Sequence, residues 1–127
     1  AYRRFAEHLG LAFQITDDLL DYLGDPAKTG KQVGNDFAEG KMTLPLLLAL
    51  GRAAEEERVR IGRLLDRPED QEAFCEMRQI LERLGGFEGA RRRAASLIDE
   101  AIQTLTPFAD GPEKEALVGL ARYVLER

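Results

Sequence analysis

Residues 9–23 read LGLAFQITDDLLDYL, and this stretch decides the fold that we expect. Its apolar residues recur at spacings of three and four, which is the period of an amphipathic α-helix. The same period continues through the rest of the chain, while the alternation typical of β-strands is absent and β-branched residues are few. The sequence therefore predicts an all-α protein built as a helical bundle.

Turn residues and prolines divide the chain into segments. We expect a first helix over residues 1–23 and a loop over residues 24–35, because Gly24, Asp25 and Pro26 favour turns. A second, leucine-rich helix is expected to begin at Asp36 or after Thr43, and its apolar character predicts deep burial. The remaining helices are predicted over residues 55–66, 70–84 and 87–105, and a last one is predicted from Pro112 onward. One domain over residues 1–127 is the expected organisation.

One face of the first predicted helix is acidic. An arc of about 100° on the helical wheel holds Gly10, Gln14, Asp17, Asp18 and Asp21. A solvated face normally mixes Lys and Glu in supporting pairs, whereas no cation shares this face, and like charges four residues apart destabilise a helix. A divalent cation would offset that cost, and Mg²⁺ takes one or two carboxylates together with waters and phosphate oxygens. A magnesium site is therefore predicted, with a solvated acidic face as the alternative.

Basic residues follow the acidic helix. Lys28, Lys31 and Lys41 are interleaved with glycines, which places positive charge on adaptable backbone. Lysine is a suitable partner for a phosphate whose other oxygens bind magnesium. The sequence thus predicts a metal–diphosphate site, although ordinary surface lysines are the alternative for these positions.

Composition excludes several other classes. The net charge of -5 argues against a nucleic-acid partner. Cys75 and His8 are the only residues of their types, which removes disulfides, cysteine-based zinc sites and most histidine-based metal sites, and indicates a reducing cytoplasm. Cys75 is expected to be a small buried apolar group. No apolar run approaches the roughly 20 residues that cross a bilayer, so no membrane span is predicted.

The start of the chain is unusual for a complete protein. It has no initiator Met, and no capping residue precedes the first helix. We expect the chain to begin inside a larger protein.

Three segments and the tail resemble a known family. They read GLAFQITDDLLDYLGD at residues 10–25, TGKQVGND at 29–36, EGKMTLPLLLAL at 39–50 and EALVGLARYVLER at 115–127. Together they resemble the second aspartate-rich region and the C-terminal part of the trans-isoprenyl diphosphate synthases. The likeness is greatest to the bacterial octaprenyl to decaprenyl diphosphate synthases. The isoprenoid synthase fold is then the one implied.

The resemblance implies specific roles. Asp17, Asp18 and Asp21 correspond to the carboxylates that hold Mg²⁺ on an allylic diphosphate, with Asp17, Asp18 and Lys31 as the catalytic set. Lys31 and Lys41 would contact the diphosphate, and Gln14 would position a substrate or a metal-bound water, with helix packing as its alternative role. The implied partners are an allylic prenyl diphosphate and isopentenyl diphosphate, whose condensation passes through a carbocation and ends with loss of a proton.

The chain also departs from that family. The first D-D-x-x-D region and the basic residues for isopentenyl diphosphate are not found in it. We therefore expect the isolated chain to be inactive and, since apolar helix faces would lack partners, to form a homo-oligomer. A non-catalytic magnesium–diphosphate module and a fragment of a short-chain synthase are the alternatives.

Overall fold

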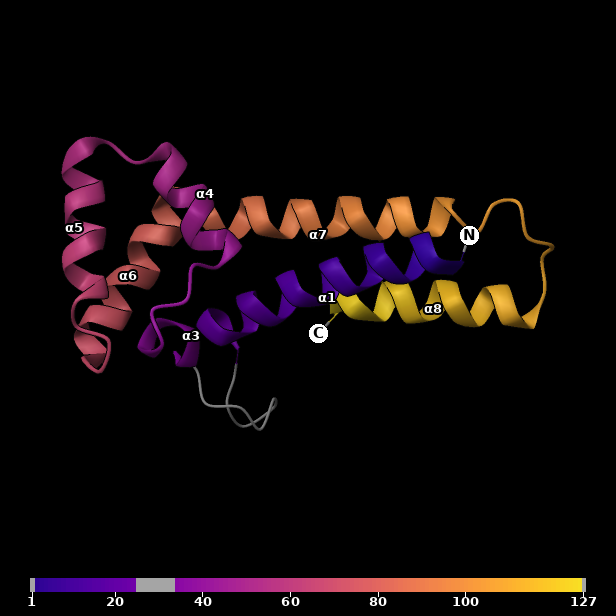
Figure 1. The fold of residues 1–127 in the computed structure, drawn as a ribbon, viewed down its shortest axis with the longest axis horizontal. Helices are drawn as coiled ribbons and strands as arrows, with labels where there is room; N and C mark the ends of the chain where they lie inside the picture. The colour runs from indigo at the N-terminus through magenta and orange to yellow at the C-terminus, as the bar shows by residue number, and fades with distance from the viewer. Residues whose placement is uncertain (1, 25–33, 127) are drawn as a thin grey trace. The chain divides into compact units, whose positions relative to one another are not determined.

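The computed structural model describes residues 2–24 and 34–126, and all regular structure in these ranges is helical (Figure 1). The elements are α1 (Tyr2–Leu23), α3 (Asn35–Ala38), α4 (Leu44–Arg52), α5 (Glu55–Leu65), α6 (Gln71–Arg83), α7 (Gly86–Gln103) and α8 (Pro112–Glu126). The all-α prediction is confirmed. None of the described helices is both long enough and apolar enough to cross a bilayer.

The two expected starts of the leucine-rich helix both exist, as separate helices. Gly34 precedes α3 with φ 87°, a left-handed conformation that a residue with a Cβ rarely adopts. Gly40 also has a positive φ of 70° and lies two residues after the end of α3. Helix α4 then begins with Pro45 in its first turn, where the missing N–H has no intrahelical acceptor to lose.

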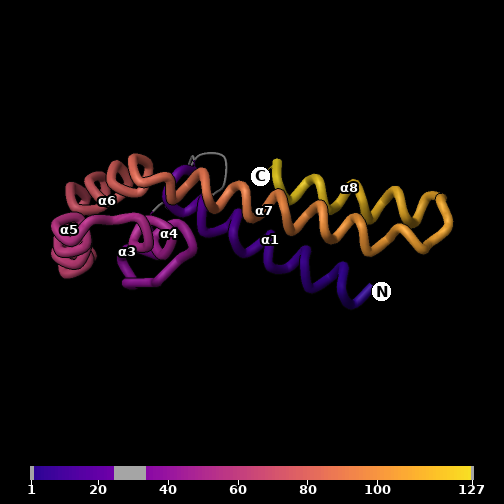
Figure 2. Tube along the Cα trace, turned by 90° about the horizontal axis from the view of Figure 1, so that it is seen from above, coloured from indigo at the N-terminus to yellow at the C-terminus, as the bar shows by residue number. Residues whose placement is uncertain are grey.

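The chain divides into two compact units, Ala1–Asp17 with Arg91–Arg127, and Asp18–Ala90. In the first unit, the early turns of α1 meet the later turns of α7, where His8 Nε2 and Glu100 Oε2 lie 3.1 Å apart, and α8 returns on the other side of α7 (Figures 1 and 2). Its buried apolar side chains recur at helical spacing, which explains the pairing. They are Phe5, Ala12, Ile15, Ala94, Leu97, Ile98, Ala101, Leu105, Ala121 and Val124.

The second unit holds the end of α1, helices α3 to α6 and the start of α7. Its buried apolar residues include Leu19, Tyr22, Phe37, Leu46, Ile61, Leu64, Met77, Leu81 and Phe87. Helices α7 and α4 begin in close contact, because a Cβ on Gly86 would stand 2.4 Å from the carbonyl oxygen of Pro45. Glycine is therefore required at the start of α7.

Two expectations about burial are wrong. Helix α4 buries Pro45, Leu46 and Ala49, but Leu47 is 48% exposed, so the helix is amphipathic rather than deeply buried. Cys75 is exposed, not a buried apolar group. It lies on α6 between the buried positions Ala73 and Met77, and the helical period turns it outward.

Candidate functional site

The three aspartates of the acidic face lie on the last turns of α1, and their exposure falls along the helix. Asp17 is half-buried and is the last residue of the first unit, whereas Asp18 and Asp21 open the second unit and are 6% and 1% exposed. A buried carboxylate is costly unless it is paired or hydrogen-bonded. The partners of Asp18 and Asp21 therefore define the site.

Asp21 accepts hydrogen bonds from three consecutive backbone amides. Its carbonyl oxygen accepts from Gly34 N–H at 2.8 Å, its Oδ1 from Asn35 N–H at 3.2 Å and its Oδ2 from Asp36 N–H at 2.9 Å. Both carboxylate oxygens are thus occupied by the start of α3. The first amides of a helix have no intrahelical acceptor, so the contact satisfies both sides.

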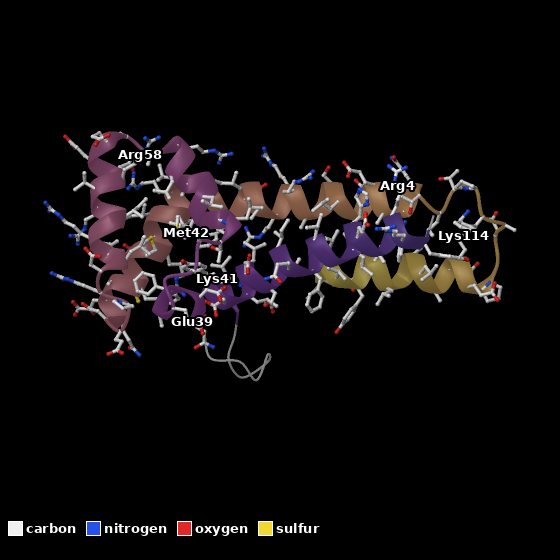
Figure 3. The ribbon with its side chains drawn as sticks, in the orientation of Figure 1. Arg4, Glu39, Lys41, Met42, Arg58 and Lys114 are labelled. Carbon is white, nitrogen blue, oxygen red and sulfur yellow. The ribbon has the colours of Figure 1, made fainter. Side chains whose placement is uncertain are left out.

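Lys41 faces the neighbouring carboxylates of the second unit. Its Nζ lies 3.5 Å from Asp18 Oδ1 and 3.9 Å from Asp36 Oδ1. Asp18 and Asp36 are largely covered, while the Lys41 side chain is 44% exposed. Figure 3 labels Lys41 in this part of the second unit, where it follows α3. An ammonium group held beside two carboxylates yet open to solvent is suited to meet an anion.

Tyr22 packs behind this acidic group. Its ring is fully buried and lies with its centroid 5.6 Å from those of both Phe74 and Phe87. Burial raises the pKa of the Tyr22 hydroxyl, and the charges of Asp21, Asp36 and Asp18 raise it further. Among the described residues the hydroxyl has no hydrogen-bond partner. Tyr22 is therefore held neutral beside three carboxylates.

The structure brings together part of the predicted set. Asp18, Asp21 and Lys41 gather in the second unit. Gln14 is exposed on α1, in the first unit, and both of its predicted roles stay predictions. Lys31 and Lys28 lie outside the described residues, so the predicted role of Lys31 stays a prediction. His8, by contrast, pairs with Glu100 at 3.1 Å within the first unit.

Sequence reasoning missed Asp36 and Tyr22. The signal for Asp36 was present, since it stands five residues before Lys41 at the start of an expected helix. Tyr22 follows Asp18 by four residues, so it borders the acidic arc on the helical wheel, but as an aromatic residue it reads as an ordinary core residue. Its complete burial, which is the main cause of the raised pKa of its hydroxyl, follows only from the fold.

The aspartate carboxylates of this site are suitable ligands for a hard cation such as magnesium, but not all to the same degree. In the portion of the chain that the structure describes, no three His, Cys, Asp or Glu side chains are gathered as a metal site. Magnesium commonly uses only one or two carboxylates and completes its shell with waters and phosphate oxygens. The half-buried Asp17 carboxylate fits that mode, whereas each Asp21 carboxylate oxygen already accepts from one backbone amide and keeps a single lone pair for a metal. Metal binding by the three aspartates stays a prediction.

Two solved structures similar to this chain are a polyprenyl synthase and a decaprenyl diphosphate synthase. A polyprenyl synthase from Caulobacter crescentus, complexed with calcium and isoprenyl diphosphate, matches with a TM-score of 0.90 and 38% identity over 98% of this chain and 38% of its own. A decaprenyl diphosphate synthase from Rhodobacter capsulatus matches with a TM-score of 0.85 and 37% identity, also over 98% of this chain and 38% of its own. The fold class is thereby confirmed.

The chain belongs to the polyprenyl synthetase family, whose model matches residues 1–84. Among curated relatives, octaprenyl diphosphate synthase of Escherichia coli is 37% identical over 97% of this chain. A short chain isoprenyl diphosphate synthase of Methanothermobacter thermautotrophicus is 40% identical over the full chain. The resemblance seen in the sequence is confirmed. The chain spans 38% and 39% of the lengths of these two relatives.

Proposed function

We propose that this chain is the C-terminal part of a trans-prenyltransferase domain that condenses isopentenyl diphosphate with an allylic diphosphate to make a long-chain polyprenyl diphosphate. The observation that supports it best is the placement of Lys41 beside the carboxylates of Asp18 and Asp36 at the end of α1, in a chain of the polyprenyl synthetase family. A similar solved structure, the geranylgeranyl pyrophosphate synthase of Corynebacterium glutamicum, is complexed with isoprenyl diphosphate and magnesium, which supports the same ligands for this chain.

In this proposal the acidic face of α1 holds Mg²⁺, with Asp17 as its most accessible carboxylate, Asp18 next to it and Asp21 as the third predicted ligand. Bound magnesium would supply Lewis-acid stabilisation of the departing diphosphate. Lys41 would neutralise the same anion with its ammonium group, and Lys31 would act likewise. Gln14 is exposed on the same helix and would orient a substrate oxygen through its amide.

Lys41 must then exchange partners when diphosphate binds. In the structure its ammonium group is shared between Asp18 and Asp36. A diphosphate with magnesium offers a stronger anionic partner, and the exposed part of the lysine side chain gives it room to turn. Catalysis in such a site is mainly electrostatic.

The relatives differ in the chain length of the product that their names give. Curated sequences similar to this chain include both octaprenyl and short-chain synthases, at 37% and 40% identity. The long-chain proposal rests on the "LLDY" and "GKMTLPLLLAL" segments at residues 19–22 and 40–50. A short-chain synthase is the alternative for the whole protein.

A test begins with ligand binding. Calorimetry with farnesyl diphosphate and MgCl₂ should show affinity for the diphosphate rising with magnesium. Asp17→Asn should remove most of that rise, while the matched exposed aspartate Asp99→Asn on α7 should keep it. Affinity independent of magnesium in the unaltered chain would refute the proposed site.

A second measurement separates an enzyme part from a non-catalytic binding module. The sequence contains one D-D-x-x-D motif, so the 127-residue chain should bind farnesyl diphosphate without elongating it. Radiolabelled product from this chain and isopentenyl diphosphate would show that one motif suffices. Product formed by a longer natural reading frame, but not by the same frame with Asp17→Asn, would favour the enzyme over the module.

Self-association is part of the same proposal. Large apolar side chains are exposed in the first unit, among them Leu11 at 57% and Phe13 at 46%. Each such side chain is worth about 1.5–3 kcal/mol when it is fully buried. We expect the chain to form a homo-oligomer, with light scattering over a concentration series as the check. A strictly monomeric species would contradict it.

A further inference from the structure

Helix α3 begins without a cap of its own. Its N-cap residue is Gly34, which has no side chain, and no local side chain accepts from the first amides of the helix. Helix starts normally need a side-chain oxygen from Ser, Thr, Asp or Asn at that position. In this chain the oxygen comes from another helix, because Asp21 on α1 accepts from Asn35 and Asp36.

We infer that Asp21 is a positioning residue, which anchors the segment from Gly34 to Lys41 on α1 and so places the Lys41 ammonium group. The inference rests on the proposed function only for the meaning of Lys41 as a diphosphate contact. The anchor itself is a property of the metal-free chain. It deepens the proposal by giving the third aspartate of the motif a task different from that of the first.

The geometry supports an anchor at the start of the segment. Three successive amides, from Gly34 to Asp36, donate to the single residue Asp21. The Asp21 side chain is 1% exposed, so its charge depends on these amides for compensation. Chain direction is fixed at the same point by the positive φ of Gly34, whose Cα lies against the Phe74 ring so closely that a Cβ would meet it at 3.3 Å.

Contacts within the short segment from Asp36 to Lys41 carry the effect of the anchor to Lys41. Phe37 is buried and packs edge-on against Phe74, with ring centroids 5.8 Å apart. Lys41 N–H donates to the carbonyl oxygen of Asp36 at 2.9 Å, and Lys41 Nζ faces the Asp36 carboxylate. Asp36 is therefore attached to Asp21 by its amide and to Lys41 by its carbonyl and carboxylate.

Asp18 completes the arrangement from the same helix. It precedes Asp21 by three residues, so the two side chains lie on one face of α1. Asp21 holds the beginning of the segment, and Asp18 lies 3.5 Å from the ammonium group at its end. The D-D-x-x-D motif thus contributes two residues that hold a lysine-bearing segment, besides the more accessible Asp17.

The experiment compares Asp21→Asn with Asp17→Asn as its matched control. Asparagine has one acceptor oxygen and no charge, so it can replace only one of the two side-chain hydrogen bonds. Amide hydrogen exchange is followed by NMR in the 127-residue chain without metal. In Asp21→Asn we expect exchange to rise by about tenfold or more at whichever of the Asn35 and Asp36 amides loses its acceptor, as loss of a hydrogen bond to a charged acceptor requires. Asp17→Asn should leave these two amides unchanged.

Amides of α6 serve as the internal reference. Global loss of stability would speed exchange at α6 and at Asn35 alike, whereas release of the anchor acts on the segment alone. Should Asp21→Asn fail to fold, the unaltered chain still decides. The first amides of a four-residue helix exchange rapidly unless something outside the helix accepts from them. Unprotected amides at Asn35 and Asp36, or equal exchange in Asp21→Asn and the unaltered chain, would overturn the inference.

Diphosphate binding is measured separately. If the anchor exists and the proposed function holds, Asp21→Asn weakens binding of farnesyl diphosphate even without magnesium, because Lys41 is displaced. Lys41→Met should weaken it as well while leaving Asn35 and Asp36 protected. Protected amides together with no farnesyl diphosphate binding would refute the function and leave the anchor standing.

Discussion

Two regions of the second unit place opposite charges in contact, in very different surroundings. At the end of α1, Asp18 and Asp21 are buried and meet Lys41 and the amides that begin α3. On the outer side of the α5–α6 pair, Arg60 bonds to Glu76. That second contact is between partly exposed side chains, 46% and 37% accessible.

The difference shows why contact alone is a poor measure of importance. The two charges of an exposed ion pair are solvated by water both in the folded and in the unfolded chain. The pair therefore contributes little to stability, and its contribution falls as the salt concentration rises. Around a buried carboxylate no water is available as a substitute acceptor. Removing the carboxylate therefore leaves its hydrogen-bond donors unsatisfied. We expect the end of α1 to be intolerant of substitution and the α5–α6 surface to be tolerant.

The largest expected effect comes from Asp21→Ala. This change leaves the amides of Asn35 and Asp36 without their acceptor in a buried place. Each of the two stranded donors costs about 1–3 kcal/mol, so the free energy of unfolding should fall by about 2–6 kcal/mol. Urea unfolding followed by circular dichroism measures it.

Glu82→Ala on α6 is the control for loss of a carboxylate, since Glu82 is exposed. A loss in Asp21→Ala no larger than in this control would break the comparison between the two regions. It would mean that water reaches the start of α3 and replaces the carboxylate.

Much of the fold follows from the sequence because helical period, glycines and prolines act locally. The end of α1 at Leu23, the stop at Arg83 before Gly85 and the start of α8 at Pro112 all lie where these signals indicate. What the sequence left open was whether the leucine-rich helix begins at Asp36 or after Thr43. Gly40, with its positive φ, interrupts the chain between α3 and α4, and the pattern of apolar residues does not register such a break.

The sequence predicts which residues make up the candidate site better than it predicts their hydrogen-bond partners. Charge type and spacing single out Asp17, Asp18, Asp21 and Lys41 as candidates, since three aspartates on one helix face with no basic residue in that arc of the sequence are unusual. The partners of Asp21 are fourteen and fifteen residues away and are backbone amides, which have no residue-type signal. Burial of Tyr22 beside three carboxylates likewise depends on tertiary packing.

An intermediate effect is expected at Tyr22 and appears only at alkaline pH. Burial and the nearby aspartates raise the pKa of its hydroxyl above the usual value near 10. The folded chain then holds a proton that the unfolded chain has lost. Stability from this group is complete below pH 10 and declines above it, by up to about 1.4 kcal/mol per pH unit.

Tyr22→Phe isolates that contribution. The variant should unfold like the unaltered chain at neutral pH, because its hydroxyl has no partner among the described residues, and should be the more stable of the two at pH 11. Tyr123→Phe is the matched control, since Tyr123 is 60% exposed. Parallel pH profiles for the Tyr22→Phe and unaltered chains would show that the buried carboxylates do not set the state of this tyrosine.

The smallest effect is expected on the α5–α6 surface. Its hydrogen bond to Arg60 lowers the pKa of the Glu76 carboxyl, so the pair contributes at neutral pH and its contribution is lost as the pH falls through the folded-state pKa of Glu76. Glu76→Gln removes the charge and keeps the shape. Thermal unfolding at pH 7 should show a shift well below that of Asp21→Ala, which shrinks further in 1 M NaCl because exposed charges are screened. At a pH low enough to protonate Glu76, the variant and the unaltered chain should unfold together.

A shift that matches Asp21→Ala and persists in high salt would mean that this pair is shielded from water as effectively as the end of α1. The contrast between the two regions would then have to be sought in the backbone amides that Asp21 accepts and not in burial.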